Sequence, residues 1–403
     1  MNAPPIRIFV ATETYPNPYR PYLDAQLAQF VRDGHDLSIL ATQAWPVVNP
    51  VIEELGLVGR TRYFPQSLRE APRFAGRMIA SAPRMLGRAL TAAGAVTDTL
   101  RTRLSAFSKA LVFPERAPDV LLVHDFWLLC TLPFLKELYP RAVVALYHHG
   151  GESSTMRVSS NARLAFELAD VVFTNTRSSR EEVLARGCGE SKVRIVPVGF
   201  NLAEYTPSLP KSRRPGGVFR LLYAGRLVEE KGLQYALEAL AIVRSRTTVS
   251  VSLTIMGNGP CRDDLEASAH RLGLTDSVHF LANQPSRKMI RAMDQFDALI
   301  LPSVPTEQWR ETQGCVVQEA MLMRLPVITT QNGGLPESIP PAMAPYSIPC
   351  RDAEALASAY ERLLAMDDRH LDELGDAGRT FVLEYYDVRE TNRALLGICA
   401  EVG

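Results

Sequence analysis

The feature that most constrains the fold is an alternation of short apolar runs with helical patterns, which occurs twice along the chain. The runs are rich in Val, Ile and Leu, as strands buried on both faces are. Because buried strands followed by helices form parallel sheets, an α/β fold of doubly wound sheets is predicted. The expected strands are Ile6–Ala11, Leu37–Ala41, Val120–Val123, Ala142–Tyr147, Val171–Thr174 and Arg194–Val196, then Phe219–Tyr223, Ser250–Met256, Val278–Leu281, Ala298–Leu301 and Val327–Thr329.

The alternation stops and restarts across residues 208–217, SLPKSRRPGG, a polar segment typical of a linker. A chain of 403 residues is long enough for two cores. We therefore expect two Rossmann-like domains, 1–207 and 208–385, with a cleft at the carboxyl ends of their strands. Residues 386–403 are expected to form a final helix that returns to the first domain.

The composition excludes several classes of protein. Lys and Arg together number 44, as do Asp and Glu, so no net charge favours nucleic acid. The six cysteines have neither CxxC nor His–Cys spacing, which indicates reduced thiols in the cytoplasm and no zinc site. The amino terminus lacks the apolar run of a signal peptide, and no run has the roughly 20 residues of a spanning helix.

Residues 69–116 carry nine basic residues against three acidic ones, interleaved with Ala, Leu, Met and Phe. This pattern predicts basic amphipathic helices inserted in the first domain. Such a surface can lie on anionic lipid at the inner face of the cytoplasmic membrane. The alternative is a solvated helix face with snorkelling arginines. The basic residues are Arg69, Arg73, Arg77, Arg84, Arg88, Arg101, Arg103, Lys109 and Arg116.

The stretch Leu301–Glu337 contains two glutamates around the start of a helical pattern. Glu311 precedes Gly314, the apolar helix pattern begins at Cys315, and Glu319 lies one turn inside it. A helix N-terminus offers free N–H groups to a diphosphate, and a glycine allows close approach. Glu319 could then accept hydrogen bonds from ribose, with Glu311 on the sugar side. The alternative is a pair of solvated surface glutamates.

Two cations follow the first strand of the second half. Arg226 and Lys231 flank the loop in AGRLVEEKGL, at the expected mouth of the cleft. Arg binds phosphate oxygens bidentately and Lys acts as a point charge, so both could stabilise a departing diphosphate. The alternative is a surface salt bridge to Glu229 or Glu230.

Weaker signals lie at the ends of the next strands. Gly257 and Gly259 in MGNGP suggest close backbone approach to phosphate or ribose, and VHFLANQP, with Phe280 and Leu281, suits backbone contacts to a nucleobase. No Asp-x-Asp stands where it could hold a metal between phosphates, and no GxGxxG follows a strand. We therefore expect no metal and no nicotinamide cofactor.

In this order, GRLVEEKG, GNGP, VHFL, ALILPSV, E-x7-E, LPVIT and GGLPE resemble the retaining nucleotide-sugar glycosyltransferases of bacterial capsule, exopolysaccharide and lipopolysaccharide synthesis (family 4, group 1). The resemblance implies the GT-B fold, metal-independent transfer with retention, and a nucleotide bound by the second domain. By position, Arg226 and Lys231 match the diphosphate-binding pair, and Glu319 the ribose-binding glutamate. Glu311 matches the donor-sugar glutamate, and the backbone of Gly314, Cys315 and Val316 the phosphate-binding turn.

The first half resembles the family more loosely. YHHGGES (147–153) aligns His149, rather than His148, with the histidine near the donor sugar. Asn201 and Val198 replace the usual Asp and Asn, and the segment after the first strand, 13–27, lacks the family's glycines. In its lack of glycines, the segment 13–27 resembles the colanic acid and amylovoran type of exopolysaccharide transferase.

These features together predict an enzyme that transfers a sugar from a UDP- or GDP-sugar to a glycan acceptor. The acceptor is expected to be lipid-linked and to lie at the cytosolic membrane surface. Catalysis is expected from Glu311, His149, Arg226 and Lys231, with the leaving diphosphate accepting the acceptor's proton. Two alternatives are an epimerase or hydrolase of the same fold and a non-catalytic sugar-nucleotide binding partner. Intact site residues argue against the second.

Overall fold

The structure is a computed structural model, and the chain divides into two compact units. The first comprises residues 1–175, 179–199 and 388–403, and the second residues 176–178 and 200–387. Residues 200–207, expected in the first domain, thus belong to the second unit. The structure describes residues 4–18, 20–46, 49–65, 84–95, 99–150, 159–209, 213–214, 217–282, 286–307 and 309–403.

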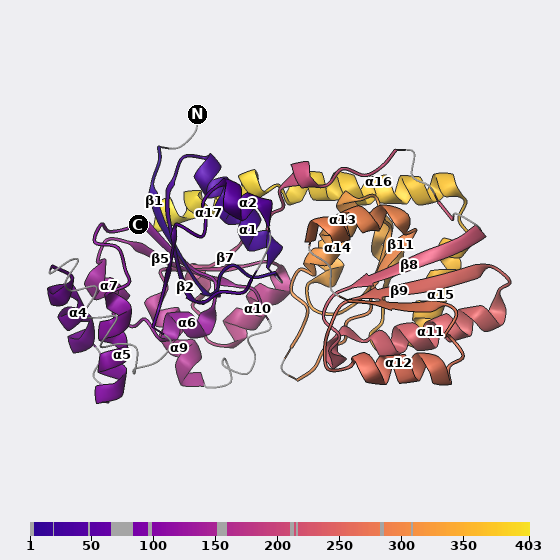
Figure 1. Cartoon of the computed structure of the whole chain (residues 1–403), viewed down its shortest axis with the longest axis horizontal. Helices are drawn as coiled ribbons and strands as arrows, with labels where there is room; N and C mark the ends of the chain where they lie inside the picture. Colours follow the sequence, from indigo (N-terminus) through magenta and orange to yellow (C-terminus); the bar gives the residue numbers. More distant parts are fainter. Residues whose placement is uncertain are drawn as a thin grey trace. The chain divides into compact units, whose positions relative to one another are not determined.

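Within the described residues, the first unit contains a parallel sheet of seven strands in the order β3-β2-β1-β4-β5-β6-β7. α1, α2 and α17 cover one face, and α6, α9 and α10 the other (Figure 1). The strands are β1 (Arg7–Thr14), β2 (Asp36–Gln43), β3 (Thr61–Tyr63), β4 (Val120–Val123), β5 (Val143–His148), β6 (Val171–Thr174) and β7 (Val193–Ile195). The helices are α1 (Pro21–Arg32), α2 (Pro50–Glu54), α4 (Arg84–Ala95), α5 (Leu100–Ala110), α6 (Phe126–Cys130), α7 (Leu135–Leu138), α9 (Ser159–Leu168), α10 (Arg177–Ala185) and α17 (Val388–Val402).

The described part of the second unit contains six parallel strands in the order β10-β9-β8-β11-β12-β13. α11 and α12 lie on one face, and α14 and α16 on the other (Figure 1). The strands are β8 (Val218–Ala224), β9 (Ser250–Met256), β10 (Val278–Leu281), β11 (Ala298–Leu301), β12 (Val327–Thr330) and β13 (Ser347–Ile348). The helices are α11 (Leu233–Arg246), α12 (Arg262–Arg271), α13 (Ser286–Ala292), α14 (Cys315–Leu322), α15 (Ala353–Leu364) and α16 (Asp368–Tyr385).

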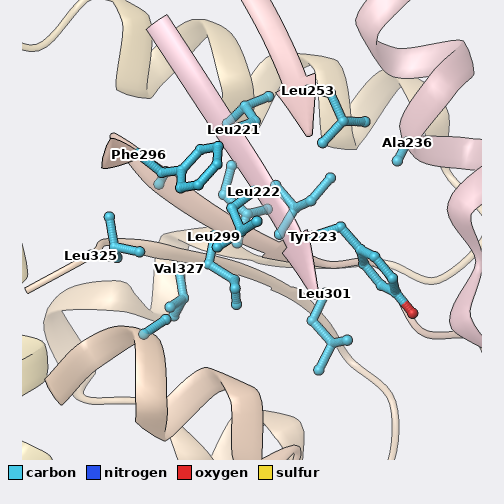
Figure 2. Close-up of a cluster of buried hydrophobic side chains, with 14 of the residues drawn as sticks. Leu221, Leu222, Tyr223, Ala236, Leu253, Phe296, Leu299, Leu301, Leu325 and Val327 are labelled. Atoms are coloured by element: carbon cyan, nitrogen blue, oxygen red, sulfur yellow. The ribbon is translucent and has the colours of Figure 1, made fainter. Parts of the chain in front are cut away.

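The core of the second unit explains why its strands could be recognised from sequence. Side chains of β8, β9, β11 and β12 fill the space between the sheet and its helices, so most of the buried side chains in these strands are apolar (Figure 2). Those labelled in Figure 2 include Leu221, Leu222, Tyr223, Leu253, Leu299, Leu301 and Val327, all nearly inaccessible to solvent.

The expected strands all exist, with ends shifted by at most a few residues. The sequence patterns do not predict β3 and β13, because both are short edge strands without an apolar run of their own. The segment expected to be a linker also makes specific contacts with the second unit, which its polar composition does not predict. Arg213 is buried and donates hydrogen bonds to the carbonyl oxygen of Asp297 and to the carboxylate of Asp372.

The C-terminal helix α17 belongs to the first unit. It packs against α1, and the side-chain amide of Asn392 donates a 3.1 Å hydrogen bond to the carbonyl oxygen of Gln26. Because Asn392 is buried, this bond satisfies a donor that would otherwise be costly to bury.

The basic insertion is described in part. Arg69, Arg73 and Arg77 lie outside the described residues, whereas α4 and α5 form a packed helical pair. Three leucines of this pair are exposed to solvent: Leu90 by 58%, Leu100 by 73% and Leu104 by 47%. In the part of the chain that the structure describes, no helix is long and apolar enough to cross a membrane.

Candidate active site

A buried ion pair lies at the carboxyl end of the second sheet. Nζ of Lys231 is 2.6 Å from Oε2 of Glu311, and the Ser303 hydroxyl donates a 2.9 Å hydrogen bond to the same oxygen. Glu311 is only 8% exposed. The interpretation of Glu311 and Glu319 as solvated surface residues is therefore wrong, since Glu319 is only 4% exposed.

The indole ring of Trp309 lies against the Lys231 side of this ion pair. The Lys231 ammonium lies 4.7 Å from the ring centroid, a cation–π contact. Trp309 belongs to the loop between β11 and α14, where the Thr306 N–H bonds to the Trp309 carbonyl and the Thr306 hydroxyl accepts the Trp309 N–H. A flat apolar ring beside a charge pair excludes water and strengthens the pair's attraction.

The turn that carries Lys231 is fixed by its neighbour Gly232. Gly232 has φ = 65°, and a Cβ there would lie 2.1 Å from the carbonyl oxygen of Pro302. Only glycine permits this approach, which brings the turn against the loop after β11. The Val304 N–H also donates a hydrogen bond to the Glu230 carbonyl. These contacts place the Lys231 side chain within hydrogen-bonding distance of Glu311.

The glycine pair after β12 holds the backbone of Glu311. The Gly334 N–H donates a 2.9 Å hydrogen bond to the Glu311 carbonyl. Gly333 has φ = 58°, and a Cβ there would lie 2.0 Å from the same oxygen. The GGLPE motif thus has a structural task in addition to any contact with a ligand.

Helix α14 begins directly after Glu311 and carries Glu319. Gly314 precedes the helix with φ = 68°, and Cys315 and Val316 are its first two residues, so their N–H groups have no partner in the preceding turn. The Tyr205 hydroxyl donates a 3.3 Å hydrogen bond to Oε1 of Glu319.

Burial dominates the electrostatics of this helix. It raises the pKa of Glu319 to about 7, aided by the charge of Glu204 and opposed by the bond from Tyr205. Burial, Glu319 and Glu311 likewise raise the pKa of the Cys315 thiol, which therefore stays neutral. The free N–H groups at the start of α14 can bind an anion. Because its pKa is about 7, Glu319 changes charge near neutral pH.

Arg226 lies in the loop after β8 and is paired with a different carboxylate from Lys231. Its side chain is 53% exposed and its guanidinium is 3.7 Å from the Glu230 carboxylate. The structure therefore shows the surface salt bridge that was the alternative interpretation, and an exposed pair of this kind contributes little to stability.

Gly257 and Gly259 approach protein backbone closely. A Cβ on Gly257 would lie 1.9 Å from the Gly225 carbonyl oxygen, and one on Gly259 2.2 Å from that of Leu227. The two loops are joined further because the Leu227 N–H bonds to the Asn258 carbonyl. These glycines thus pack the loops after β8 and β9 together, a role that needs no ligand.

The end of β10 has its own internal contacts. The Leu281 carbonyl accepts the Gly257 N–H at 3.1 Å, and the Arg262 guanidinium lies 5.7 Å from the centroid of the Phe280 ring. Residues 283–285 of the expected nucleobase loop lie outside the described residues.

His149 belongs to the first unit, at the carboxyl end of β5. It is half-buried, and its Nε2 lies 2.8 Å from Nδ1 of His124. Its neighbour His148 is buried 3.9 Å from Glu182. Residues 151–153 of the histidine motif lie outside the described residues.

Three residues that contact the candidate site were not predicted from the sequence: Ser303, Trp309 and Tyr205. Ser303 could have been found, because it follows β11 at the same sheet edge as the other candidates. Trp309 and Tyr205 lie in irregular segments, where no periodicity marks a side chain for the site. No group of three metal-binding side chains occurs among the residues that the structure describes.

Comparisons with known proteins identify the family and the fold that this chain resembles. The profile of the family "Glycosyl transferases group 1" matches residues 206–381. The chain is 24% identical over 385 residues to a putative colanic acid biosynthesis glycosyltransferase, WcaL, of Salmonella typhimurium, covering 93% of this chain and 94% of the relative. It is 25% identical to the amylovoran biosynthesis glycosyltransferase AmsK of Erwinia amylovora, covering 84% and 86%.

Among solved structures, Anabaena HepE in complex with UDP superposes with a TM-score of 0.72 at 17% identity, covering 98% of this chain and all of that one. This likeness shows that the two parallel sheets form the GT-B fold. The chain is a glycosyltransferase: its residues 206–381 match the group 1 family, whose members are retaining and metal-independent, and relatives with this activity are similar over most of its length.

Proposed function

We propose that this enzyme transfers a sugar, with retention, from a UDP-sugar to a glycan acceptor in the synthesis of an exopolysaccharide, capsule or lipopolysaccharide. The observation that carries the proposal is the buried Lys231–Glu311 pair beside the start of α14, with Glu319 one turn further. A diphosphate at the helix start would place ribose toward Glu319 and the sugar toward Glu311.

In this proposal Lys231 and Arg226 stabilise the leaving diphosphate, and Glu311 faces the sugar as positive charge grows at its anomeric carbon. The diphosphate itself accepts the acceptor's proton, so no protein base is needed. His149 contributes from the first unit, which takes the acceptor. The backbone of Gly257, Gly259, Phe280 and Leu281 completes the nucleotide contacts.

The choice of UDP and of a polysaccharide product is supported by the relatives. HepE was solved with UDP and with UDP-glucose, and two relatives that match most of the chain are named as glycosyltransferases of colanic acid and amylovoran biosynthesis. A GDP-sugar is the alternative donor.

The test is a thermal-shift screen against UDP, GDP, ADP and dTDP, followed by transfer with the corresponding nucleotide sugars. UDP should give the largest shift, since a ligand at a hundred times its Kd stabilises by about 2.7 kcal/mol. Proton NMR of the product should show retention of the anomeric configuration. Nucleotide release at the same rate with and without an acceptor would favour a hydrolase, and binding without turnover a non-catalytic partner.

We also propose that the enzyme acts on a lipid-linked acceptor at the inner face of the cytoplasmic membrane, docked through α4 and α5. These helices expose Leu90, Leu100 and Leu104 beside the exposed Arg101 and Arg103. Exposed leucines next to arginines are complementary to an anionic lipid surface, whose interior takes the apolar side chains while its headgroups bind the cations.

A further inference from the structure

Two histidines meet at the carboxyl edge of the first sheet. His124 follows β4 and His149 follows β5, and these strands are paired in parallel, so both side chains leave the same edge. The Nδ1 of His124 lies 2.8 Å from the Nε2 of His149, and the rings are within 7° of parallel. Their centroids are 5.0 Å apart, which is the hydrogen bond plus the two ring radii. The rings therefore lie edge to edge in nearly one plane.

Neither ring carries a positive charge at neutral pH. Burial lowers the pKa of His124 to about 3, with Arg20 adding to the effect and Asp125 opposing it. Burial, His124, Arg20 and His148 lower the pKa of His149 well below its usual value. Each ring then holds one proton, and the bond between them needs one donor and one acceptor.

The other nitrogen of His124 decides which ring donates. Its Nε2 is buried and has no hydrogen-bond partner among the described residues. A buried N–H without an acceptor is rarer and more costly than a lone pair without a donor. The proton of His124 therefore belongs on Nδ1, where it is donated to His149.

The loop that carries His124 is itself anchored. The carboxylate of the adjacent Asp125 accepts hydrogen bonds from the Thr12 hydroxyl at 2.8 Å, the Glu13 N–H at 2.6 Å and the Arg20 guanidinium at 2.7 Å. These bonds tie the end of β4 to the end of β1, so the His124 ring has little freedom to turn away.

We propose that His124 is a positioning residue for His149: its Nδ1–H donates to Nε2 of His149 and holds that ring as the tautomer protonated on Nδ1. His149 then presents a fixed N–H donor, suited to a hydroxyl oxygen of a bound sugar. A freely rotating imidazole would present donor and acceptor in turn. The role in catalysis rests on the proposed function, whereas the tautomer does not.

The tautomer is tested on the protein without ligand. Nitrogen-15 NMR of histidine-labelled enzyme distinguishes the two neutral forms, and the His149 signals are assigned by their loss in His149→Gln. Wild-type His149 should be protonated on Nδ1, and His124→Phe should convert it to a mixture. A wild-type His149 protonated on Nε2 overturns the proposal, whatever the enzyme's activity.

The effect on catalysis is tested with UDP-glucose as the donor. In His124→Phe, kcat should fall about tenfold while KM changes less than about twofold, because one hydrogen bond is lost without loss of the nucleotide site. His124→Asn, whose amide can replace Nδ1–H, should recover most of kcat. His35→Phe is the matched control, since that ring lies before β2, at the other edge of the sheet, where it accepts the Ile6 N–H.

A double variant separates positioning from a direct role. His124→Phe should lower kcat no further in a His149→Ala background, since the two act as one unit. Losses that multiply would overturn the proposal. Melting curves show whether each variant is folded. If His124→Phe does not fold, the proposal is tested by the activity of His124→Asn and by the tautomer of His149 in the wild-type enzyme.

Discussion

Nζ of Lys231 lies 2.6 Å from Oε2 of Glu311, although the two residues are 80 positions apart in the chain. The pair joins the turn after β8 to the loop before α14, so one contact couples the expected phosphate-binding cation to the expected sugar-binding carboxylate. Both side chains are largely buried, so each charge offsets part of the free energy lost when the other is removed from water.

The first prediction concerns the stability of this pair. Lys231→Ala should lower the free energy of unfolding by about 3 kcal/mol, because among the described residues it leaves the buried Glu311 carboxylate with the Ser303 hydroxyl as its remaining side-chain partner. Adding Glu311→Gln should recover part of the loss by removing the orphaned charge. Urea denaturation of the single and double variants measures both. Equal stabilities of Lys231→Ala and the double variant would contradict this account.

The second prediction concerns the phosphate role of Arg226. Since this side chain is exposed and only weakly paired, Arg226→Ala should leave the melting temperature unchanged. It should weaken UDP binding about tenfold or more and leave uridine binding unaffected, because charge-assisted bonds to phosphate are worth roughly 1.5–3 kcal/mol. Calorimetry with the two ligands measures the difference, and equal losses for both would remove Arg226 from this role. Arg369→Ala, on the exposed face of α16, is a control.

The third prediction concerns Glu311 in turnover. Glu311→Gln keeps the size of the side chain but removes the charge that would stabilise a developing cation on the sugar. We expect kcat to fall by more than KM rises, since the interaction strengthens in the transition state. Glu319→Gln should act mainly on KM for the donor. Steady-state kinetics of both variants decide, and identical effects would argue against separate roles.

The fourth prediction concerns pH and Glu319. Its folded pKa of about 7 lies above its ordinary value of 4.5. The folded state therefore holds a proton that the unfolded chain releases between these values. The free energy of unfolding should fall by up to about 3 kcal/mol as pH rises through this window. Glu319→Gln should abolish this slope in denaturation measured at several pH values.

Ligand binding at Glu319 should have the opposite trend. Ribose hydroxyls donate best to the ionised carboxylate, so uridine should bind about tenfold more tightly at about pH 8 than at about pH 6. Uridine is used because it has no phosphate to titrate in this range. An affinity independent of pH in the wild type, or an equal trend in Glu319→Gln, would separate Glu319 from ribose.

The fifth prediction concerns membrane association. The enzyme should sediment with anionic vesicles at low salt and detach as salt rises, because surface charges are then screened. Changing Leu100 and Leu104 together to Ser should reduce sedimentation at every salt concentration, whereas changing Arg101 and Arg103 to Gln should act mainly at low salt. Leu209→Ser should have no effect, because Leu209 is also highly exposed but belongs to the second unit. Wild-type enzyme that stays in solution with such vesicles would contradict the docking proposal.

The sequence by itself determined the elements and the start of the site. A strand buried on both faces is almost entirely apolar, so β4, β6 and β11 could be predicted with their observed ends. The ends of β9 and β10 also match the prediction, although these two strands include exposed residues. Gly314 followed by an apolar pattern likewise located the first residue of α14, and the glycine accepts the left-handed conformation that the backbone adopts just before this helix.

Only the tertiary structure decided which of these groups meet and how they are charged. Lys231 reaches Glu311 because Gly232 lets two loops touch, and Gly257 and Gly259 serve contacts that no spacing reveals. The pKa of Glu319 depends on its burial and on Glu204 and Tyr205, and the bond between His124 and His149 on the pairing of β4 with β5. Local patterns reflect the environment of a single segment, whereas distances, burial and charge depend on segments far apart in the chain.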